Sequence, residues 1–195
     1  MEKGIFKDRE KAMEATYFRQ QDAKLVEKLR QEAQLDDIAR TLAEKLEVDN
    51  PELLLRVREL GVTTDTAPAF FLAPLVQVAW AEGSVTKQES DTVLRLARAR
   101  GIEGNSPAYA QLLDWLRVRP ADMVFDTAVE VIRYGFAVLP PQEKEKRIKR
   151  VVEACYEVAA ASGGGIASVL GLGTVVSGAE ASMLDIITKS LRKHS

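Results

Sequence analysis

The sequence predicts an all-α protein, and three observations lead to that prediction. Apolar residues recur with the 3.6-residue helical period in almost every segment of the chain. No stretch shows the sustained alternation of polar and apolar residues that is typical of a half-buried strand. Proline and glycine interrupt the periodic segments at short breaks, which implies that successive helices pack as antiparallel neighbours in a bundle.

The first part of the chain predicts a charged helical arm. Residues 5–33 carry only sparse apolar points, so we expect an exposed helix with a thin contact stripe, followed by an amphipathic helix over residues 35–46. Asn50-Pro51 then combines a capping side chain with a proline at the first helical position, which favours a new helix. We assign residues 1–61 to an N-terminal helical arm and residues 62–195 to a helical domain.

The next segment predicts the central helix of that domain. Residues 67–81 are apolar nearly all round, and a helix without a polar face should be covered by its neighbours. Pro74 lies inside this segment and predicts a kink or a late start, and Gly83 should end the helix. Thr86 and Glu89 then form a capping box that starts another helix.

Four later helices complete the prediction. Ser106-Pro107 starts the first by the same cap-then-proline pattern, and Arg119-Pro120 separates it from the second. The third should cover about residues 141–161 and bury Cys155 as a packed thiol. The last follows the glycine-rich loop 162–177.

Composition excludes several classes of function. The net charge of −2 over 195 residues gives no overall attraction to nucleic acid or to anionic lipid. His194 is the single histidine and Cys155 the single cysteine, which excludes an intrachain disulfide and a thiolate or histidine metal site. His194 is also the penultimate residue of the sequence, so we expect no Ser–His or Cys–His catalytic pair. The sequence therefore predicts a protein that is not an enzyme.

The sequence also favours a cytoplasmic protein. Its first ten residues are too charged for a secretory signal. Val158–Ala179 carries no charge and is long enough to span a bilayer, but its six glycines favour a loop between helices over a membrane span. We therefore expect no integral membrane segment.

Two parts of the chain repeat one pattern. Residues 78–89 and 158–180 each contain an apolar helix end, a glycine stop, a Ser/Thr cap and a glutamate three residues after the cap. The caps are Thr86 and Ser177, and the glutamates are Glu89 and Glu180. This repeat predicts two helical hairpins, related by a pseudo-two-fold axis, whose apolar first helices pack together.

The string Val78–Glu89, VAWAEGSVTKQE, resembles the AxADGxVSxxE signature of the TerB-like family, which is named after tellurite resistance protein TerB. The likeness covers about residues 66–193 and implies an all-helical fold with two such hairpins. Members of the family occur in tellurite-resistance operons and beside co-chaperone J-domains, and some bind a divalent metal through acidic residues of these loops. The resemblance implies a protein-interaction or stress-response module rather than an enzyme.

The same resemblance implies a metal site formed by Glu82, Glu89 and Glu180. Calcium and magnesium prefer oxygen ligands, and calcium takes six or more, so backbone carbonyls and water would have to supply the remainder. The chain departs from the family pattern, because Glu82 replaces the usual aspartate and Ser162 stands where the second loop would carry its acid. The alternative is that Glu89 and Glu180 reach back to cap backbone amides, which needs no ion.

A second resemblance concerns the arm. Phe6–Ala15 is similar to the opening of the zeta inhibitor subunit of F-type ATPases, which implies a regulator that inhibits through its first helix. Our leading hypothesis remains a non-catalytic TerB-like module whose arm and glycine-rich loop contact a partner protein. The helical spacing of Trp80 and Trp115 favours core packing, with an anchor for a partner as the alternative.

Overall fold

A computed structural model describes residues 50–162 and 176–193, together with Lys24 and Glu44. The chain divides into two units, Met1–Arg40 and Thr41–Ser195, and the second contains the described helices α2 to α10. Several predicted features lie outside the described residues. They are the contact stripe of residues 5–33, the helix of residues 35–46, the segment similar to the zeta subunit and most of the glycine-rich loop.

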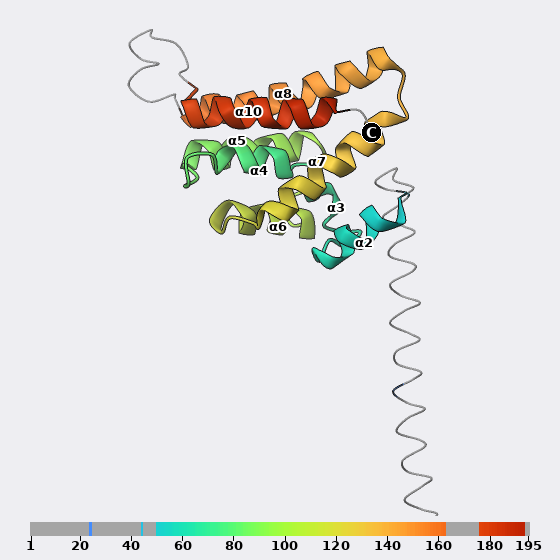
Figure 1. Cartoon of the computed structure of the whole chain (residues 1–195). Coiled ribbons are helices and arrows are strands. Elements are labelled where there is room, and N and C mark those ends of the chain that lie inside the picture. The colour runs from blue at the N-terminus through green and yellow to red at the C-terminus, as the bar shows by residue number, and fades with distance from the viewer. Residues whose placement is uncertain (1–23, 25–43, 45–49, 163–175, 194–195) are drawn as a thin grey trace, which may run out of the picture. The chain divides into compact units, whose positions relative to one another are not determined.

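The described residues form helices joined by turns, and they contain no strand, which confirms the all-α prediction. Figure 1 shows the helices of this unit. They are α2 (Pro51–Glu59), α3 (Ala67–Phe70), α4 (Ala73–Ala79), α5 (Lys87–Ala99), α6 (Pro107–Arg117), α7 (Asp122–Ala137), α8 (Pro141–Ser162) and α10 (Gly178–Arg192).

Two helices begin at the predicted combination of a cap and a proline. The Asn50 side chain accepts a hydrogen bond from the Leu53 amide at 3.1 Å, and Pro51 follows as the first residue of α2. The Ser106 hydroxyl accepts one from the Tyr109 amide at 3.2 Å at the start of α6. Each cap satisfies an amide that has no partner inside its helix, so both starts are determined locally.

The apolar segment 67–81 forms two helices rather than one. α3 ends at Phe70, and α4 begins at Ala73 with Pro74 in its first turn. Proline has no amide hydrogen to donate and its ring crowds the preceding turn, so it is accommodated at a helix start and not in a helix interior. The prediction of a late start is confirmed, and α3 is the short helix that precedes it.

α4 is the central helix of the unit. It contacts α5, α6, α7, α8 and α10, and every residue of α4 except Gln77 is buried. This agrees with the covered position that its apolar sequence predicts.

The helices on either side of the two predicted turns lie together. α4 packs against α8, α5 also packs against α8, and α10 packs against α4, α7 and α8. Figure 1 shows the turn between α4 and α5 at the same end of the unit as the start of α10. The start of α5, which follows this turn, and the start of α10 therefore lie at one end of the unit.

α2 belongs to the second unit, so the domain boundary differs from the predicted one at residue 61. Leu53 and Val57 of α2 are fully buried, and the helix packs against α7. Arg56 also forms an ion pair with Glu130 of α7 at 2.7 Å. α2 lies in the second unit because the bundle covers its apolar face, and the division between the units lies after Arg40.

No helix within the described ranges is both long enough and apolar enough to cross a membrane. The uncharged segment considered above lies mainly in residues 163–175, outside those ranges.

Candidate functional site

The first capping box closes the turn between α4 and α5. Thr86 donates its amide hydrogen to Oε2 of Glu89 at 2.7 Å, and its hydroxyl donates to the same oxygen at 2.7 Å. The Glu89 amide donates in return to the Thr86 hydroxyl oxygen at 3.2 Å. The box predicted at the start of α5 is confirmed.

The second capping box begins α10. The Ser177 amide donates to Oε2 of Glu180 at 2.8 Å, and the Glu180 amide donates to the Ser177 hydroxyl oxygen at 3.2 Å. Both hairpins therefore restart their second helix with the same reciprocal hydrogen bonds, and this confirms the capping interpretation of the two glutamates.

Both capping glutamates are buried, which is unusual for this motif. Glu89 is 1% exposed and Glu180 is fully buried, and both rank among the largest fully buried side chains. Glutamate is almost never fully buried unless it is paired, because taking a carboxylate out of water is costly. The cap hydrogen bonds and the positive end of each helix dipole offset part of that cost.

The surroundings of Glu89 raise its pKa above the ordinary value for a glutamate. Burial is the main cause, and the charges of Glu180 and Glu82 add to it, whereas the hydrogen bonds from Thr86 oppose it. Charges influence each other's pKa mainly at short range. The structure therefore brings the three predicted acids to one end of the bundle, with Glu82 exposed in the turn.

Their arrangement differs from that of a preformed metal centre. Among the residues that the structure describes, no group of three or more His, Cys, Asp or Glu side chains is arranged to hold a metal ion. One oxygen each of Glu89 and Glu180 already accepts cap hydrogen bonds. The side chain of Ser162 and the loop after it lie outside the described residues.

The two tryptophans connect α4 to α6. The indole Nε1 of Trp80 donates a hydrogen bond to the backbone carbonyl of Trp115 at 2.8 Å, and both side chains are half-buried. A half-buried tryptophan whose indole NH has a partner is a packing residue of the bundle.

Cys155 is buried in α8, as predicted for a packed thiol. Burial raises the pKa of the thiol to about 12, and the positive charge of Arg100 acts in the opposite direction. A thiol in this state is protonated and inert near neutral pH.

Gln77 is not among the site residues that the sequence predicts. It is the single polar residue within α4, and a polar residue in an otherwise apolar central helix is the signal that points to it.

Comparison with known proteins identifies no relative of this chain. The chain matches no family model, no curated protein and no solved structure. The likeness to the TerB-like family therefore depends on the residues of the two hairpins themselves.

Proposed function

We propose that the chain is a non-catalytic helical module of the TerB-like type that binds a protein partner through its N-terminal arm. The observation that carries the proposal is the pair of buried capping boxes, one on each hairpin. Glu89 and Glu180 play the same local role, and the charge of one acts on the other.

The packing of the helices supports the same interpretation. A two-fold relation between the hairpins would exchange α4 with α8 and α5 with α10. Under this exchange the contact between α5 and α8 corresponds to a contact between α10 and α4. Both contacts occur in the structure. Direct packing of α4 on α8 is the third contact that such a relation requires.

Residues 1–40 of the arm are the proposed contact with the partner because of their sequence and because the chain divides into two units after Arg40. The apolar residues of the arm are too sparse for a core, and the division of the chain after Arg40 places residues 1–40 in a unit of their own. An amphipathic helix with a thin apolar stripe is a common recognition element for a groove on another protein.

A truncation tests this proposal. We expect a variant without residues 1–40 to keep the helical circular dichroism and the cooperative unfolding of the full chain. We also expect it to lose the partners that the full chain retains in quantitative affinity capture. A matched control keeps the arm but replaces its apolar residues Phe6, Met13, Tyr17, Phe18, Leu25 and Leu29 with serine.

Two outcomes would contradict the proposal. A truncated protein without cooperative unfolding would place the arm in the core. Unchanged capture by both variants would exclude the arm as the contact surface.

The alternative function is binding of a divalent cation at the turns. It is favoured by the raised pKa of Glu89, because a cation near Glu82, Glu89 and Glu180 would relieve the repulsion among these carboxylates. Binding would require Glu89 and Glu180 to exchange cap hydrogen bonds for metal contacts.

Calorimetry with calcium, magnesium and manganese decides this alternative. Binding heat that is lost in Glu82→Gln and kept in Glu103→Gln, an exposed glutamate outside the turns, would support it. The absence of heat at millimolar metal would reject it.

A further inference from the structure

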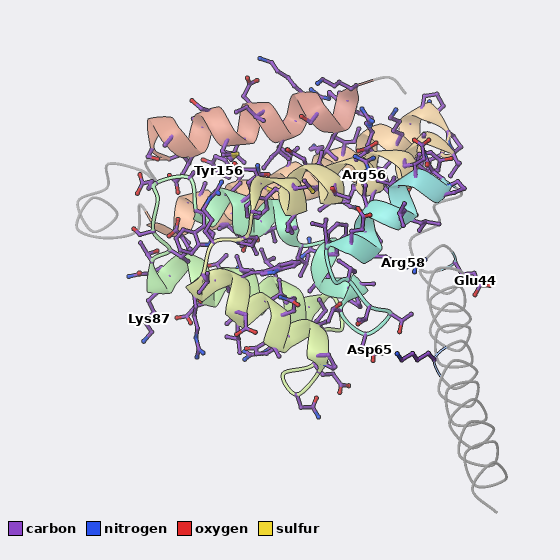
Figure 2. The ribbon with its side chains drawn as sticks, turned by 60° about the horizontal axis from the view of Figure 1, so that its bottom comes forward. Glu44, Arg56, Arg58, Asp65, Lys87 and Tyr156 are labelled. Atoms are coloured by element: carbon purple, nitrogen blue, oxygen red, sulfur yellow. The ribbon has the colours of Figure 1, made fainter. Side chains whose placement is uncertain are left out.

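We draw no further inference here: the strongest candidate, the groove between α8 and α10 that is lined by Val152, Thr188 and the exposed Tyr156 (Figure 2), carries none because nothing in the described part of the chain shows what covers it.

Discussion

Glu89 combines two properties that oppose each other energetically. Its carboxylate accepts two hydrogen bonds from Thr86, which favours the ionised form, yet its burial and its acidic neighbours favour the neutral form. The sequence predicted the hydrogen bonds because a capping box is local. It could not predict the burial, which depends on how other helices cover the turn.

The raised pKa of Glu89 makes stability depend on pH in a definite direction. At pH values between the Glu89 pKa of the unfolded chain and that of the native state, the native state binds more protons at Glu89 than the unfolded chain does. The free energy of unfolding therefore falls as pH rises through this range. Glu89→Gln has no proton to lose in this window. We therefore expect the stability of the natural chain relative to Glu89→Gln to be highest in mild acid and to decrease toward neutral pH.

Urea unfolding of both proteins across this pH range measures the difference. Glu103→Gln, at an exposed position, controls for the loss of one negative charge. A stability difference that rises with pH would contradict the raised pKa.

Cys155 should react only when the protein unfolds. Its side chain is fully buried and burial raises its pKa to about 12, so neither access nor thiolate is present in the native state. We expect no labelling by a thiol reagent near pH 8 in buffer and complete labelling in denaturant. Rapid labelling of the folded protein would show that α8 is not packed as described.

Helix boundaries are where sequence and structure agree most closely. Asn50, Thr86, Ser106 and Ser177 each cap a helix, and each was identified by its side chain and the residues that follow it. The separate helix α3 was less clear, because Pro74 permits either a kink or a new start and the packing of the segment decides between them.

The glycine that ends the turn after α4 allows a test of the backbone conformation at that turn. Gly83 has a φ of +83° with nothing within 4 Å of an added Cβ, so a substitution there acts through the backbone alone. We expect Gly83→Ala to lower the free energy of unfolding by about 1 kcal/mol or more. Gly104→Ala is the matched control, since Gly104 also has open space but no positive φ.

Thermal or urea unfolding of the two variants gives the answer. Equal stability of Gly83→Ala and Gly104→Ala would contradict the left-handed turn between α4 and α5.

Contacts between helices that are far apart in the sequence were predicted less completely than the helix boundaries. The packing of α4 on α8 follows from two apolar helices in repeated hairpins, and it was expected. The inclusion of α2 in the bundle was not expected, because its two fully buried residues find their cover on α7. A pocket between α4, α7 and α10 was also not predicted, since lining residues such as Gln77 and Arg133 lie on different helices that only packing brings together.

The arrangement of the two hairpins is tested most directly by the titration of Glu89 in the natural chain and in Glu180→Gln. Side-chain carboxyl shifts in NMR spectra report the pKa at this single site. The structure predicts a Glu89 pKa above the ordinary value for a glutamate in the natural chain, and a lower Glu89 pKa in the variant, because the nearby charge of Glu180 is removed. A Glu89 pKa that is ordinary in the natural chain and unchanged in the variant would show that the two capped turns do not meet.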